Sequence, residues 1–110
     1  MSTTNESAAS IAAQNTFTGI CTGQNGVATM VVTGTFVATV VMQIRAPRDT
    51  DGSLWADDNT GWSDVTDALL TAAGQKTTVP LGGSWQVRAG IKTAGYTSGT
   101  AKVWIKAQVS

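Results

Sequence analysis

Hydrophobic and polar residues alternate with a period of two along most of the chain after residue 16. In residues 101–109, Ala, Val and Ile alternate with Lys, Trp and Gln, and residues 85–92 show a similar pattern. Successive side chains of a β-strand point to opposite faces of its sheet, so this alternation predicts strands with one buried face. We predict that the two segments pair as a hairpin, bend at Gly95 and Gly99, and carry a basic outer face.

The strongest predicted strand covers residues 35–45. Both of its faces begin with apolar residues, which indicates a central strand that becomes more exposed towards Arg45. Residues 67–73 have a helical composition, but a short turn or an irregular strand fits them equally well. Further strands are predicted at residues 17–22, 27–33, 62–65 and 75–79, with turns at residues 24–26 and 81–83.

Seven or eight short strands at regular spacing, without a long helix, are typical of an all-β protein. We therefore expect a small antiparallel β-sandwich, Ig-like or jelly-roll-like, over residues 16–110. Residues 1–15 are mostly small and polar. We expect them to form an extended N-terminal arm that a neighbouring subunit holds, and the alternative is a disordered tail.

Seven basic and seven acidic residues cancel, so the net charge is zero. This balance favours neither a nucleic acid nor a membrane surface as a partner. Charged residues make up only 13% of the chain, which is well below the usual share. A surface so poor in charge favours partial covering by other subunits, and hence a homo-oligomer. No stretch is long and apolar enough for a membrane-spanning helix, and residues 1–16 lack the pattern of a secretory signal.

The chain contains no histidine and one cysteine, Cys21. Histidine is the commonest general base and the commonest metal ligand, so its absence removes many catalytic mechanisms. A cysteine nucleophile needs a base and a cationic neighbour, and neither lies near Cys21 in the sequence. We therefore predict that the protein is not an enzyme and needs no cofactor, and that Cys21 is a small strand residue.

Six of the seven acidic residues lie between positions 49 and 67. Asp49 and Asp51 precede Gly52 in the manner of half a calcium loop, because alternate carboxylates before a tight turn can supply oxygen ligands. A third alternate carboxylate and a closing Glu are missing, so a solvated loop whose Asp residues shape its turns is the main interpretation. If this segment binds calcium, Asp49 and Asp51 are the candidate ligands.

Trp55 and Trp62 flank the same acidic segment. An exposed tryptophan beside carboxylates and amides suits a sugar-binding surface, because the ring can stack on the face of a pyranose. Trp62 opens a predicted strand, so we expect it to pack in the core, as we expect of Trp85. Trp55 is therefore the candidate for a glycan contact.

Trp104 lies on the polar face of its predicted strand, between Lys102 and Lys106. Lysine stems or a partner protein can cover an apolar residue in such a place. Arg88 and Lys92 share this face of the predicted hairpin, which fits a solvated surface or an acidic neighbour, such as the Asp-rich loop of another copy, equally well. The predicted interface residues are Ile11 in the arm, Arg88, Lys92 and Trp104.

Three stretches resemble a family of small phage virion proteins. They are residues 34–45, with the sequence GTFVATV followed by Gln43 and Arg45; residues 61–66, GWSDVT; and residues 85–101, with WQVRAGIKT followed by GYTSGTA. The resemblance covers residues 26–107. The chain departs from the family where residues 46–60 enlarge a short turn between two strands.

The resemblance implies a virion structural protein, most simply a capsid decoration or cement protein, or a tail-associated module, and it implies no catalytic residue. The expected partners are the major capsid protein or other virion proteins, and further copies of the chain, in a trimer by analogy. The expected location is the virion, assembled in the host cytoplasm. The alternative function is a carbohydrate-binding or fibre-associated adhesion module that uses Trp55.

Overall fold

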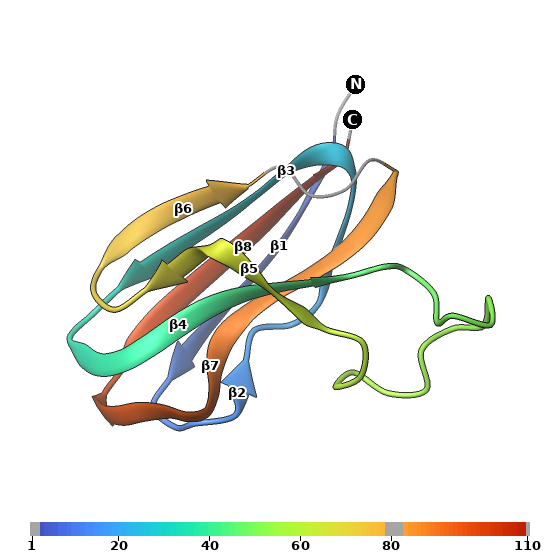
Figure 1. Cartoon of the computed structure of the whole chain (residues 1–110). Coiled ribbons are helices and arrows are strands. Elements are labelled where there is room, and N and C mark those ends of the chain that lie inside the picture. Colours follow the sequence, from blue (N-terminus) through green and yellow to red (C-terminus); the bar gives the residue numbers. More distant parts are fainter. Residues whose placement is uncertain (1–2, 79–82, 110) are drawn as a thin grey trace.

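The computed structural model describes residues 3–78 and 83–109, and these residues form eight strands and no helix (Figure 1). The all-β fold class is confirmed. The strands are β1 (Thr3–Ile11), β2 (Thr16–Phe17), β3 (Cys21–Thr33), β4 (Phe36–Arg45), β5 (Ser63–Leu70), β6 (Gly74–Thr78), β7 (Ser84–Gly99) and β8 (Ala101–Val109).

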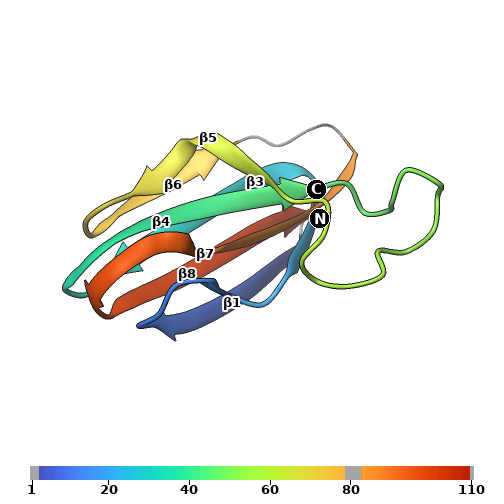
Figure 2. The same cartoon turned by 60° about the horizontal axis from the view of Figure 1, so that its bottom comes forward.

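All strand pairs are antiparallel and belong to one sheet in the order β1-β8-β3-β7-β4-β5, with β2 beside β7 and β6 beside β3. The sheet bends over itself, so the buried faces of its strands enclose one core (Figure 2). We call β1, β8, β6 and the second half of β3 the β8 layer, and β2, β7, β4 and β5 the β7 layer. The result is a small antiparallel β-sandwich.

β3 joins the two layers. Cys21–Gln24 pairs with β7, whereas residues 28–33 lie between β8 and β6. The change of partner occurs at a bulge where the register shifts at Asn25 and again before Ala28, and the φ angle of Asn25 is 52°. The turn predicted at residues 24–26 is therefore wrong, because the positive φ that Asn favours also permits a bulge inside a continuous strand.

The predicted strands at residues 35–45, 85–92 and 101–109 are confirmed. The exposure expected towards Arg45 is wrong, because Arg45 is only 7% exposed whereas Val37 near the start of β4 is 58% exposed. The predicted hairpin between the last two strands is also wrong. β7 continues to Gly99 in pairing with β4, and the chain then crosses to the other layer at Thr100. In the sheet, β3 lies between β7 and β8. The outward side chains of β7 and β8 therefore lie on opposite outer faces of the sandwich.

The segment expected to be an arm held by a neighbouring subunit is an edge strand of its own domain over Thr3–Ile11. It pairs with β8 along its whole length, from Thr3 opposite Val109 to Ile11 opposite Ala101. Its polar side chains also reach the other layer: the Asn5 amide donates to the carbonyl of Thr22 at 2.6 Å, and the amide of Gly19 donates to the Ser7 hydroxyl at 2.8 Å. The side chain of Ile11 has no exposed surface, so it is a core residue and not a free contact for a partner.

Two smaller expectations are settled by the strand bounds. Residues 67–70 continue β5, so the strand alternative holds for them. The strand predicted at residues 17–22 is interrupted, because β2 ends at Phe17 and β3 begins at Cys21. β2 lies so close to β7 that a Cβ at Gly90 would stand 2.2 Å from the carbonyl oxygen of Thr16. Part of the turn predicted at residues 81–83, and residue 79 of a predicted strand, lie outside the described residues.

Ile11→Ala should lower the free energy of unfolding by about 2–5 kcal/mol, because it removes a fully buried side chain and leaves a cavity where β1 meets the core. Val37→Ala is the matched control, since the Val37 side chain is 58% exposed. Urea unfolding of both variants measures the difference. Equal losses of stability would contradict the placement of β1 in the core.

Candidate functional site

The segment between β4 and β5, residues 46–62, forms a long loop that stands out from one end of the sandwich (Figures 1 and 2). Its base folds back over the outer face of the β7 layer. Two arginines on that face, Arg45 of β4 and Arg88 of β7, are each only 7% exposed. They are buried because the loop covers them.

The arginines alternate with aromatic rings in a stack that we call the arginine–aromatic ladder. The Arg45 guanidinium lies 5.1 Å from the ring centroid of Trp55 and 4.5 Å from that of Trp62. The Arg88 guanidinium lies 4.7 Å from the same Trp62 ring and 3.9 Å from the ring of Phe17. These distances are those of cation–π contacts, so Trp62 shares its ring between two cations.

The guanidiniums also bind the loop backbone. Arg45 Nη1 donates to the carbonyls of Asp57 at 3.1 Å and Thr60 at 2.8 Å. Arg88 Nη1 donates to the carbonyl of Asp58 at 3.0 Å, and burial, followed by the charge of Arg45, lowers the pKa of Arg88. The two cations are thus stabilised by carbonyl dipoles and ring faces, and the loop provides most of both.

A chain of polar side chains continues from the ladder along the β7 layer. Arg88 Nε donates to Gln43 Oε1 at 2.9 Å, and Gln43 Nε2 donates to Asp64 Oδ1 at 2.8 Å. Lys92 Nζ forms an ion pair with Asp64 Oδ2 at 2.8 Å. The hydrogen bond from Lys92, followed by that from Gln43, lowers the pKa of Asp64. Arg88 and Lys92, both predicted as interface residues, therefore have partners within their own chain.

The tryptophans occupy different places from those expected. Trp62 lies in the ladder on the outer face and not in the core, because its ring contacts the guanidiniums of Arg45 and Arg88 there. Trp85 is 1% exposed in the core, as predicted, and its Nε1 has no hydrogen-bond partner. Trp55 is half-buried: Arg45 lies over its ring, and a Cβ at Gly61 would stand 2.3 Å from that ring. Little of the Trp55 ring remains for a glycan.

The calcium candidate Asp49 and Asp51 lies at the tip of the loop. The Asp51 carboxylate accepts hydrogen bonds from the amide and the hydroxyl of Ser53, which lower its pKa, and the Asp49 carboxylate accepts from the amide of Thr50. Both carboxylates thus shape the turn, as the main interpretation predicted. Residues 3–78 and 83–109 contain no group of three or more acidic or cysteine side chains placed to hold a metal ion.

Cys21 lies buried at the start of β3. Burial, with a smaller contribution from the charge of Glu6, raises the pKa of its thiol. A buried, protonated thiol is a weak nucleophile, so this side chain acts as a small core residue.

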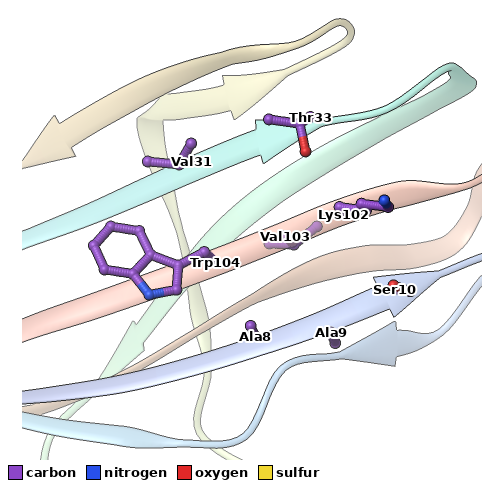
Figure 3. A pocket seen from close by; sticks show the side chains of 8 residues that line it. All are labelled: Ala8, Ala9, Ser10, Val31, Thr33, Lys102, Val103 and Trp104. Carbon is purple, nitrogen blue, oxygen red and sulfur yellow. The ribbon is translucent and has the colours of Figure 1, made fainter.

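The outer face of the β8 layer carries a shallow groove of about 390 Å³ beside Trp104 (Figure 3). Ala8 of β1 and Val31 of β3 lie opposite Trp104 on its two sides. Both neighbours are small, and the indole between them is half-buried. We call this the Trp104 groove, and it is lined by Ala8, Ala9, Ser10, Val31, Thr33, Lys102, Val103 and Trp104.

Lys102 forms one end of the groove (Figure 3). Its register neighbours are Ser10 of β1 and Thr33 of β3, so no carboxylate lies beside it in the sheet. Lys106, the other lysine of this face, has Glu6 as its neighbour on β1. The groove therefore combines an apolar floor with one cation that has no acidic neighbour in the sheet.

Comparisons with protein-family models, with curated proteins and with solved structures give no match to this chain. Within residues 3–78 and 83–109, the structure contains no helix with the length and apolar character needed to cross a membrane.

Arg45→Met should lower the free energy of unfolding by about 2 kcal/mol, because the carbonyls of Asp57 and Thr60 lose their charged donor and two tryptophan rings lose their cation. Amide hydrogen exchange should become faster in residues 46–62 and stay unchanged in β8. Arg48→Met is the control in the same loop, since Arg48 is exposed and makes one hydrogen bond of 3.3 Å to Gly52. Unchanged exchange in Arg45→Met would contradict the role of the ladder.

The lowered pKa of Asp64 predicts that the stability of the fold depends on pH. A carboxyl whose pKa is depressed by folding stabilises the fold above its unfolded pKa of about 3.9, and this contribution is lost as the pH falls through the folded value. The free energy of unfolding of the wild type should therefore fall below about pH 5, and Asp64→Asn should reduce that fall. The change should stay under about 1 kcal/mol because the Asp64 and Lys92 side chains are 41% and 51% exposed.

The control for this measurement is Asp67→Asn, which removes an exposed carboxyl from the same strand. Urea unfolding of the three proteins between pH 3 and pH 7, at about 0.1 M salt, gives the slopes. A wild-type slope in Asp64→Asn would show that the ion pair does not contribute to the acid lability of the protein.

Proposed function

We propose that this chain is a virion structural protein of a phage that decorates or cements a capsid by contacts between subunits. The observation that carries the proposal is the Trp104 groove. Tryptophan is enriched in the energetically important centres of protein interfaces, and a half-buried ring beside an apolar groove still offers apolar area to a partner. Lys102 beside it gives direction to an acidic partner.

The outer faces of the two layers differ in how much surface they leave for a partner. The outer face of β7 is committed to the ladder and the Lys92–Asp64 ion pair, which hold the loop in place. The outer face of the β8 layer has no comparable cover among the described residues. A rigid sandwich with one free, partly apolar face suits a protein that binds a shell and stiffens it by binding.

The assignment to a phage rests on the sequence resemblance over residues 26–107. The partners it implies are the major capsid protein or other virion proteins, together with further copies of the chain. The alternative of a carbohydrate-binding module has less support from the geometry, because Arg45 and Gly61 take up much of the ring of Trp55. The proposed role involves no catalytic step.

Phage particles purified from the source organism test the proposal. The chain should remain in density-banded, washed particles in many copies, and Trp104→Ser should lower its occupancy, because the groove loses its apolar centre. Quantitative mass spectrometry of the particles measures both effects. Val37→Ser, which changes an exposed aliphatic residue of β4 outside the groove, is the control.

Absence of the wild-type chain from the particles would overturn the proposed function. Equal occupancy of the wild type and Trp104→Ser would leave the chain a virion protein but remove the groove as its contact. Binding of wild-type protein to a glycan array, lost in Trp55→Ala, would replace the proposal with the carbohydrate-binding alternative.

A further inference from the structure

The tip of the loop presents an exposed leucine on an ordered turn. Leu54 is 71% exposed, more than the other exposed large hydrophobic side chains of the described residues, Val37 at 58% and Leu69 at 46%. The turn before it is closed by two backbone hydrogen bonds of 2.9 Å, from Asp49 to Ser53 and from Gly52 to Asp49. An apolar side chain held out by an ordered turn loses little conformational freedom when it binds.

The turn beside Leu54 carries two carboxylates, Asp49 and Asp51, and one cation, Arg48, whose guanidinium donates to the carbonyl of Gly52. Hydrogen bonds from Ser53 lower the pKa of Asp51, so it stays ionised well below neutral pH. The tip is therefore an exposed apolar residue next to a turn with more negative than positive charge.

The Trp104 groove has the opposite character. Its floor is apolar, its volume is about 390 Å³, and the cation at its end, Lys102, has no acidic register neighbour. The far part of the loop projects beyond the end of the sandwich in both views, so its tip is free to meet another molecule (Figures 1 and 2). An apolar side chain beside a carboxylate thus suits an apolar floor beside a cation.

We propose that Leu54 of one copy binds in the Trp104 groove of a second copy, with Asp51 beside Lys102. This inference rests on the proposed function, since it names the partner of the same groove. The tip and the groove lie at different places on the chain, so each copy offers one of each. The contact is heterologous: it joins copies head to tail, and it closes into a ring where the rotation allows, as a cement around a symmetry axis requires.

The mode of assembly makes a specific prediction for mixtures of variants. Leu54→Asp spoils the tip and leaves the groove intact, whereas Ala8→Arg fills the groove and leaves the tip intact. Each variant alone should associate at least about tenfold more weakly than the wild type. A 1:1 mixture should form heterodimers that do not grow, because only one productive contact remains in it.

Sedimentation velocity over a concentration series up to about 1 mM measures these species. Trp104→Ser serves as a second groove variant, and circular dichroism and urea unfolding show whether each variant is folded. Val37→Asp is the matched control, because it places the same charge on an exposed aliphatic residue outside both surfaces, and it should associate like the wild type.

A wild type that stays monomeric at the highest concentration would overturn the inference, as would wild-type association in Leu54→Asp. A mixture that fails to form heterodimers, although each variant alone is weakened, would also overturn it. These results are separate from the test on particles. A monomer found in the virion keeps the proposed function and removes this contact, whereas head-to-tail association of a chain absent from particles does the reverse.

Discussion

Two buried guanidiniums on neighbouring strands hold the base of the loop over the outer face of the β7 layer. Removing a charge from water costs several kcal/mol per ion, and Arg45 and Arg88 bear like charges on paired strands. Four ring contacts and the carbonyls of Asp57, Asp58 and Thr60 offset that cost. Opening the loop would remove all of these groups except the ring of Phe17, so the fold of the loop and the burial of the arginines depend on each other.

The ladder also explains why β4 and β7 have a stretch that is buried on both faces although the domain has only two layers. Apolar side chains such as Val40 and Val87 face the core, whereas Gln43 and the two arginines are buried on the outer face, where the base of the loop lies. The loop thus acts locally as a third layer. On the other side of the molecule no loop covers β8 among the described residues, and Trp104 is only half-buried there.

The sequence predicted the strands better than their partners. Alternation identifies the faces of β4, β7 and β8 because it is a local property of an extended chain. Pairing depends on distant residues: Asn25 produces a bulge where a turn was expected, and β3 therefore separates β7 from β8. The groove and the ladder could not be predicted for the same reason. Ala8 and Val31 lie beside Trp104 only because of the registers of β1 and β3 with β8. Arg45 contacts Trp62 only because the loop folds back over β4.

The small number of charged residues can be interpreted once the position of each one in the structure is known. Of the seven basic residues, Arg45 and Arg88 are buried in the ladder and Lys92 is paired with Asp64. Two of the remaining four, Lys102 and Lys106, lie on β8, while four of the seven acids lie in residues 46–62. The chain has no net charge, but its charges are unevenly distributed: β8 carries two lysines on the outer face of its layer, and the loop carries more acidic than basic residues. Such a distribution orients copies relative to one another without adding net charge that would make them repel.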